Sequence, residues 1–357
     1  MVDRHNPYIA GAPVVEKRMF FGREGVFDWI EHSLSGKYVN HILVLHGQRR
    51  VGKTSVLKHF PNRLPNKYIP VFIDLQGRVS TSLGRFLGWL AREITRALKE
   101  QGIELPRSDR KAFEDDPEYF ENVFLPAIQS HLGEKILLLT FDEFDTFESS
   151  GAQEGLAIPF MAILKRLMNY PYLSFVFSIG SSGRKLENMQ AAYTSFFKQA
   201  LYRKISFLET DDAHELVIKP VENVVAYSEE AVERILNVTN RHPYFVQLIC
   251  HELFSECQKN DDWQVTLDGV NAILDPVVER GTVNLKFVWD EADDLEKWVL
   301  AVLATTDNGL NFGELEARLK NEQVRYTRQE LERSLLHLRE KDVITQNNAF
   351  VIYLLKL

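Results

Sequence analysis

The chain has 357 residues, of which 45% are hydrophobic and 26% are charged, and its formal net charge is −8 at pH 7. This composition is typical of a water-soluble protein of two or three domains, and the acidic balance excludes a general attraction to nucleic acids or anionic lipids. Because no apolar run is long enough to span a membrane and no signal-peptide pattern is visible, we expect no membrane partner. Cys250 and Cys257 are too far apart on a predicted helix for a disulfide, which favours a reducing cytoplasm.

Up to about residue 208, apolar runs alternate with amphipathic segments, as in an α/β fold whose parallel sheet is covered by helices on both faces. Residues 1–22 are predicted to form an extended lead-in, because Pro and Gly residues there would interrupt a helix or strand. The predicted strands are Ile42–Leu45, Tyr68–Leu75, Lys135–Phe141, Leu173–Ile179 and Arg203–Leu208. The predicted helices are 24–35, one that follows the first strand, 80–101, 118–132 and 157–168, whereas the charged segment 107–116 is expected to be a loop.

The part of the chain after residue 208 is predicted to be mainly helical. Start signals and apolar spacing predict a small helical lid domain that ends near Asp275 and Pro276, with helices at Thr210–Lys219, Ser228–Val238 and Pro243–Gln258. Two short strands at 343–345 and 350–354 flank a turn and follow the helices Asp293–Thr305, Phe312–Lys320 and Thr327–Lys341. This order predicts a winged helix. The predicted domains are therefore 1–208, 209–285 and 290–357.

A glycine-rich stretch follows the first predicted strand, with the sequence Gly47-Gln48-Arg49-Arg50-Val51-Gly52-Lys53-Thr54. It matches the P-loop pattern G-x-x-x-x-G-K-[ST], in which backbone N–H groups wrap a polyphosphate. We expect this whole stretch, and Ser55 at the start of the next helix, to bind nucleotide phosphates. Lys53 would reach the β- and γ-phosphates, and the Thr54 hydroxyl would hold Mg²⁺. The alternative is a glycine-rich turn without function.

Two neighbouring carboxylates end the apolar strand that precedes them. Asp142 and Glu143 are placed by this pattern at the carboxyl edge of the sheet, which they would share with the P-loop. Asp142 would orient Mg²⁺, and Glu143 would polarise the water that attacks the γ-phosphate. The alternative is a polar strand end without a catalytic role. For Asp145 we leave open whether it caps the turn or supports the site.

Other candidates for nucleotide contacts follow later strands and open a helix. Ser181 would sense the γ-phosphate and Arg184 would neutralise developing charge, although a plain Gly-Ser turn with a solvated arginine is the alternative. Arg203, on the last predicted strand, is a rival to Arg184. His242 and Pro243 open a helix that would approach the nucleotide from the lid, and a proline-started helix with a surface histidine is the alternative.

The ordered set of motifs resembles the archaeal-ATPase-like branch of the STAND NTPases, which lies near the origin-recognition type of AAA+ ATPase. The segments that carry the resemblance over about residues 6–260 are Phe20–Glu24, the P-loop, Leu137–Asp145 and His242–Phe245. The resemblance implies an ASCE-type P-loop NTPase sheet in which another strand lies between the P-loop strand and the Asp-Glu strand. It also implies ATP as the nucleotide, with Phe21, Gly22 and Arg23 binding the base. Arg241 replaces the glycine of the family's Gly-x-Pro signature.

We therefore expect a slow, Mg²⁺-dependent ATPase in which the γ-phosphate holds or releases the lid, so that ATP and ADP switch its association with itself or with another protein. The alternative is a DNA-binding ATPase or loader that uses residues 327–341 as a recognition helix. Residues 290–357 contain 9 basic and 13 acidic residues, a balance that does not favour DNA. A P-loop kinase is a third possibility, but the Asp-Glu strand end suits water activation better.

Overall fold

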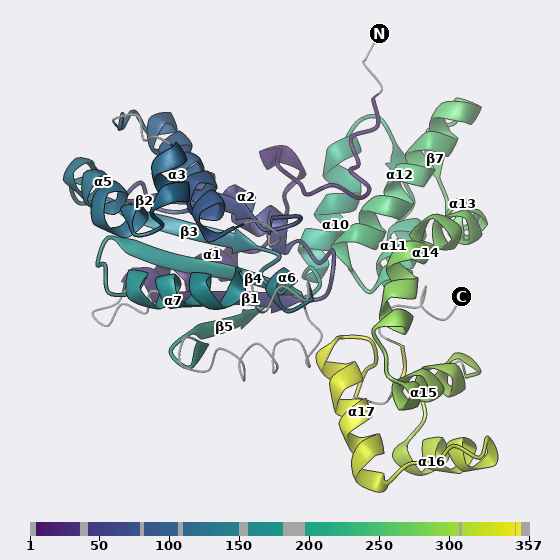
Figure 1. The fold of residues 1–357 in the computed structure, drawn as a ribbon. Helices are drawn as coiled ribbons and strands as arrows, with labels where there is room; N and C mark the ends of the chain where they lie inside the picture. Colours follow the sequence, from purple (N-terminus) through teal and green to yellow (C-terminus); the bar gives the residue numbers. More distant parts are fainter. Residues whose placement is uncertain are drawn as a thin grey trace. The chain divides into compact units, whose positions relative to one another are not determined.

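A computed structural model describes residues 5–35, 42–78, 82–105, 110–149, 156–180, 197–306, 309–346 and 348–350. The chain forms two compact units, which Figure 1 shows together. The first, here called the sheet unit, comprises Arg23–Gly47 and Lys53–Ile205. The second, here called the helical unit, comprises Met1–Gly22, Gln48–Gly52 and Ser206–Leu357. The P-loop therefore contributes residues to both units.

The sheet unit is built on five parallel strands in the order β2-β3-β4-β1-β5. Their bounds are β1 (Ile42–Gly47), β2 (Tyr68–Asp74), β3 (Ile136–Asp142), β4 (Leu173–Gly180) and β5 (Leu201–Lys204). The central strands β3 and β4 are buried at all but one residue each, as their continuous apolar sequences predict. Because β4 lies between β1 and β3, the strand order implied by the family resemblance is confirmed.

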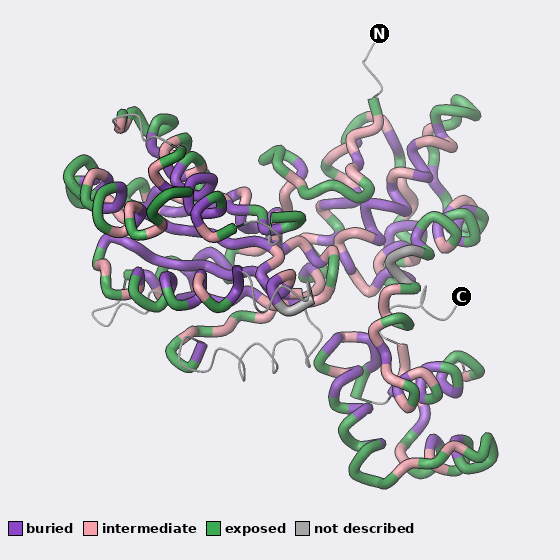
Figure 2. The backbone as a smooth tube through the Cα atoms, in the orientation of Figure 1, coloured by how far each residue is buried: buried purple, intermediate pink, exposed green. Residues whose placement is uncertain are grey.

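Helices cover both faces of this sheet, with α3 and α5 on one face and α7 on the other (Figure 1). The buried positions in Figure 2 follow the strands and the inward faces of these helices. Aromatic rings fill much of the core, and the rings of Phe141 and Phe177 stack with centroids 5.3 Å apart. The helices are α1 (Glu24–Ser35), α2 (Lys53–Arg63), α3 (Leu83–Glu100), α4 (Arg110–Asp115), the π-helix η2 (Phe120–Phe124), α5 (Leu125–Leu132), α6 (Thr146–Ser149) and α7 (Ala157–Leu167).

Two of the sequence predictions for this unit are wrong. The charged segment predicted as a loop contains α4, because Phe113 is buried and packs against Tyr119 and Phe124. Gly84 of α3 permits this packing, since a Cβ there would overlap the backbone of Phe113. The last strand is β5 rather than Arg203–Leu208, because pairing with β1 ends where the Ile205 N–H donates to the carbonyl of His46 (2.7 Å).

The helical unit has a core of its own, to which the lead-in contributes Tyr8 and Met19. Its elements are η1 (Lys17–Met19), α10 (Thr210–Ile218), η4 (Lys219–Val221), β6 (Ala226–Tyr227), α11 (Glu229–Thr239), α12 (Pro243–Asn260), β7 (Gln264–Val265), α13 (Leu267–Ala272) and α14 (Leu274–Asp290). α14 continues to Asp290 through Pro276, near which the sequence predicts the end of the lid domain, and that end remains a prediction. Pro276 lies in the first helical turn, where a missing N–H removes no helical hydrogen bond.

Both cysteines of this core are free and buried. Burial raises the pKa of the Cys250 thiol to about 12, so that the thiol is neutral at physiological pH. In the described part of the chain, no helix is both long enough and apolar enough to cross a membrane.

Three capped helices, α15 (Asp294–Ala304), α16 (Phe312–Asn321) and α17 (Arg328–Glu340), form a further apolar cluster in the helical unit. Each begins with a capping box, in which the N-cap side chain and a glutamate three residues later bond each other's backbone N–H groups. Ile344 and Phe350 form an antiparallel bridge, but residues 351–354 of the predicted hairpin lie outside the described residues. The winged helix and the domain boundaries 1–208, 209–285 and 290–357 remain predictions.

Candidate nucleotide site

The P-loop runs between the end of β1 and the start of α2. Gly52 has φ +101°, a conformation that side chains with a Cβ rarely adopt, so the glycine of the motif is required by the backbone. Lys53 is only 7% exposed, and its Nζ donates a hydrogen bond to the carbonyl of Gly47 (2.9 Å). The ammonium group is therefore held at the glycine that opens the loop. Ser55 is buried in the first turn of α2, and the positive end of a helix dipole favours an anion.

Thr54 and Asp142 are brought together although they are 88 positions apart in sequence. The Thr54 hydroxyl donates to Oδ2 of Asp142 at 2.6 Å, and Asp142 is 3% exposed. The other carboxylate oxygen, Oδ1, is buried and accepts no hydrogen bond from the described residues. A buried oxygen without a donor beside a hydroxyl suits a hard cation, since Mg²⁺ prefers oxygen ligands. Thr54 and Asp142 are thus the residues that would hold Mg²⁺, which would neutralise phosphate charge when bound.

Replacing Thr54 tests this pairing. Thr54→Ala leaves both oxygens of a buried carboxylate without a donor among the described residues, so we expect the free energy of unfolding to fall by roughly 1–3 kcal/mol. Thr54→Ser keeps the hydroxyl and is expected to stay much closer to the parent chain. Urea unfolding of the three proteins measures the difference. Equal stability of the alanine and serine variants would contradict the pairing.

Glu143 occupies a tight turn directly after β3. Its φ is +53°, a left-handed conformation that is uncommon for a residue with a side chain. The turn is held because the Glu143 carbonyl accepts bonds from the N–H (3.0 Å) and the hydroxyl (2.7 Å) of Thr146. The Phe144 N–H bonds the carbonyl of Ser178 on β4 at 2.9 Å. A half-exposed carboxylate on a backbone held at both sides is suited to orienting a water molecule.

Asp145 links the ends of two neighbouring strands. Its Oδ1 accepts the Gly180 N–H at 3.2 Å, and the side chain is 6% exposed. A Cβ at Gly180 would lie 3.0 Å from the other oxygen, Oδ2, so the glycine leaves room for the carboxylate. Of the two roles left open by the sequence, this contact favours structural support.

The candidates for γ-phosphate contacts are only partly covered by the structure. Ser181 and Arg184 lie outside the described residues. Arg203 lies on β5 opposite Leu45 of β1, and its guanidinium is near Gly25 of α1. The choice between Arg184 and Arg203 therefore remains open.

The base-binding candidates stand where the chain passes from the helical unit to the sheet unit. Phe21 is partly buried against the core of the helical unit. Gly22 has φ +70°, and a Cβ there would overlap the carboxylate of Asp212. Arg23 has φ +75°, and its carbonyl accepts the N–H of Val26 (2.9 Å) at the start of α1. Two successive left-handed residues thus form a sharp turn within this motif.

His242 is the N-cap of α12 and Pro243 is its first residue. Nδ1 of His242 accepts the Tyr244 N–H at 3.3 Å, and the ring lies 5.0 Å from that of Phe245. At 2% exposed, His242 is not the surface histidine of the alternative interpretation. Arg241, which replaces the family's glycine, has φ +63° and so adopts a conformation that glycine would favour.

The sequence did not predict the contacts made by the side chains at the x positions of the P-loop pattern. All of these contacts are with residues of the helical unit. The Gln48 side-chain amide donates to the carbonyl of Lys341, just after α17. The Arg49 guanidinium lies 4.9 Å from the ring centre of Phe287 on α14. The Arg50 guanidinium donates to the carbonyl of Gly11 (3.1 Å) and lies 4.7 Å from the ring centre of Tyr244 on α12. No local pattern announces these partners, because they are distant in sequence.

Comparison with known proteins agrees with this geometry. Residues 38–186 match the family described as an AAA domain. The match covers less than half of the chain and, together with the sheet described above, supports a P-loop NTPase fold for these residues. An uncharacterized ATP-binding protein of Pyrococcus abyssi is 25% identical over 201 residues, which make up 55% of this chain and 59% of that protein. The matched region is therefore less than two thirds of that relative.

Solved structures extend the likeness to nearly the whole chain. The Walker-type ATPase of Pyrococcus abyssi superimposes with a TM-score of 0.70 over 97% of both chains, at 18% identity. The ORC2 protein of Aeropyrum pernix superimposes with a TM-score of 0.61 over 99% of this chain and 95% of that one, at 12% identity. At these identities the likeness establishes the fold, and the predicted P-loop NTPase sheet followed by helical regions is confirmed.

Proposed function

We propose that this protein is an Mg²⁺-dependent ATPase of the STAND class whose nucleotide state switches its association with itself or with another protein. The observation that carries the proposal is the group formed by Lys53, Thr54 and Asp142. The Lys53 ammonium bonds the first glycine of the P-loop, and the Thr54 hydroxyl bonds the buried Asp142 carboxylate. Such a group suits a nucleoside triphosphate with its metal ion, because it supplies a phosphate ligand and metal ligands within one domain.

Hydrolysis in this proposal is the task of Glu143, which orients and deprotonates the attacking water while Lys53 stabilises the phosphate charge. Ser181 and either Arg184 or Arg203 would contact the γ-phosphate. The base would bind at Phe21, Gly22 and Arg23, with His242 and Pro243 nearby in the proposed role of the lid. The turnover is expected to be slow, since a switch must persist in one state long enough to be read by its partner.

The switch is supported by the contacts of the P-loop side chains. Gln48, Arg49 and Arg50 contact segments at the end of α17, on α14 and on α12. Phosphate binding orders the P-loop backbone, so these side chains would transmit the change to the helices that they contact. The signal would then pass to a second copy of the chain or to another cytoplasmic protein.

The test combines activity and mass. Phosphate release from ATP is measured with Mg²⁺ and without any acceptor, and light scattering after size exclusion is recorded with ATP, with ADP and without nucleotide. We expect phosphate release that EDTA abolishes and a change of mass with ATP. Absence of phosphate release would overturn the ATPase, and identical mass profiles would overturn the self-association branch.

The second candidate, a DNA-binding ATPase, is favoured by one structural likeness. The structure of Drosophila ORC bound to DNA superimposes with a TM-score of 0.51 over 97% of this chain, at 14% identity. Two of the three arginines of α17 have side-chain partners, which argues against DNA here. Arg328 pairs with Glu332 (3.0 Å), and Arg339 donates to Oδ1 of Asn348 (2.7 Å). Lys341, which follows α17, is 6% exposed and lies 3.5 Å from a carboxylate oxygen of the buried Glu296.

We therefore expect no DNA complex even at low salt. A fluorescence-polarisation titration of a labelled duplex at about 20 mM salt, up to roughly 10 μM protein, measures this, since non-specific binding by phosphate contacts is strongest there. Binding that weakens steeply as salt is raised would support the DNA-binding candidate instead.

A further inference from the structure

We propose that Asn6, Tyr8 and Gln247 are positioning residues for the nucleobase. They fasten the lead-in to the helices of the helical unit, so that Phe21 and Gly22 are held ready to bind the base. This inference rests on the proposed function of those two residues. It predicts that side chains remote from the base-binding motif control affinity for the base and leave affinity for the phosphates unchanged.

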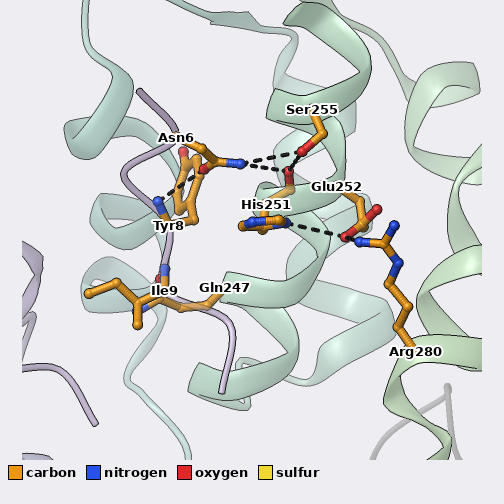
Figure 3. A network of polar contacts seen from close by, with 8 residues as sticks. All are labelled: Asn6, Tyr8, Ile9, Gln247, His251, Glu252, Ser255 and Arg280. Atoms are coloured by element: carbon orange, nitrogen blue, oxygen red, sulfur yellow. Dashed lines mark hydrogen bonds and ion pairs between the residues drawn. The ribbon is translucent and has the colours of Figure 1, made fainter. Parts of the chain in front are cut away.

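The polar side of this attachment runs along α12 (Figure 3). The Asn6 side-chain amide donates to the carbonyl of His251 (3.0 Å), and its Oδ1 accepts the Tyr8 N–H (3.1 Å). One residue later, the Ile9 N–H donates to Oε1 of Gln247 at 2.8 Å. Gln247 is 4% exposed. Because the lead-in is not paired in a sheet here, the Ile9 N–H takes its hydrogen-bond partner from this buried side chain.

Tyr8 is the residue by which the lead-in enters the core of the helical unit. It is 3% exposed in the core of the helical unit, and its hydroxyl donates to the carbonyl of Val217 on α10 at 2.5 Å. Burial raises the pKa of Tyr8 far above its ordinary value, so the phenol stays protonated and remains a donor. One tyrosine thus joins the lead-in to α10 while its neighbours join the lead-in to α12.

The helix that receives the lead-in is itself fastened. Glu252 of α12 is 7% exposed and forms an ion pair with Arg280 of α14, and it also contacts His251 (3.2 Å) (Figure 3). The attachment points on α12 are therefore fixed relative to α14.

The remaining lead-in follows the same surface up to the base-binding motif. Met19 is 3% exposed in the core of the helical unit, and Phe21 packs against this core. Gly22 lies next to the carboxylate of Asp212 on α10. Between these points the described lead-in has a single short helix, η1, so its order depends on its attachments. If the attachment at residues 6–9 is lost, the fraction of molecules with Phe21 in place falls, and the apparent dissociation constant of the base rises by the inverse of that fraction.

The experiment compares Mg·ATP with Mg·triphosphate, an inorganic ligand that has the phosphates but no base, by isothermal titration of the full chain. Gln247→Leu removes the acceptor of Ile9, and Asn6→Ala is a milder variant at the less buried end of the network. We expect each to weaken ATP binding about tenfold and to change triphosphate binding less than about twofold. Asn260→Ala, which removes an exposed amide from the end of α12, is the matched control and is expected to bind both ligands as the parent does.

The outcomes separate the inference from the function on which it rests. Equal losses for ATP and triphosphate, or no loss for ATP in both variants, would overturn the positioning role. Phe21→Ala serves as the reference for the base site and is expected to reduce ATP binding selectively. If Phe21→Ala leaves the ratio of the two affinities unchanged, the base-binding proposal fails, and the positioning role fails with it.

Discussion

Glu143→Gln is expected to lower the rate of ATP hydrolysis by roughly 10²- to 10⁴-fold and to change ATP affinity by less than about twofold. The amide keeps the size of the carboxylate but cannot accept the proton of the attacking water. Since the turn is held by the Glu143 backbone carbonyl and by Phe144, the substitution leaves the backbone in place. Single-turnover phosphate release and equilibrium binding of ATP, measured on the same preparation, separate the two effects.

A matched control exists near the other end of the same strand. Glu134 is exposed in the turn before β3, and Glu134→Gln makes the same chemical change away from the P-loop. It is expected to leave hydrolysis at the parent rate. If Glu143→Gln hydrolyses ATP as fast as this control does, Glu143 is not the base.

Lys53→Ala is expected to weaken ATP binding by roughly 10- to 100-fold, because hydrogen bonds from a charged donor contribute about 1.5–3 kcal/mol each. Lys53, whose buried ammonium bonds the carbonyl of Gly47, is the only lysine of the P-loop sequence. No neighbour in that stretch can therefore replace it. Isothermal titration with Mg·ATP and with Mg·ADP measures the loss. The affinity for Mg·ATP is expected to fall more than the affinity for Mg·ADP, since Lys53 is predicted to reach the γ-phosphate as well.

Lys58→Ala controls for the loss of a lysine from the same helix. The ammonium of Lys58, on α2, lies 4.9 Å from the ring centre of Phe72 on β2. This variant is expected to bind ATP as the parent does. Parent-like ATP binding by Lys53→Ala would contradict the central proposal.

Features that depend on contiguous residues can be predicted from the amino-acid sequence. The P-loop, the buried strand that ends in Asp142 and Glu143, and the type of each strand and helix in the alternating series are visible from local spacing. The prediction of a loop around α4 fails because it relies on local composition alone. A single buried ring at Phe113 outweighs a charged local composition, and Pro276 is harmless only at its position in the first turn.

Contacts between groups that are distant in sequence become visible in the folded chain. Thr54 and Asp142 share a hydrogen bond because α2 starts just after β1, and the carboxyl ends of the parallel strands β1 and β3 lie at the same edge of the sheet, with β4 between them. No local pattern states this arrangement. The attachment of the lead-in through Tyr8 and Gln247, and the partners of Gln48, Arg49 and Arg50, are likewise products of packing between segments far apart in the chain. Periodicity reports which face of an element is apolar, whereas the partner of that face depends on the free energy of the whole fold.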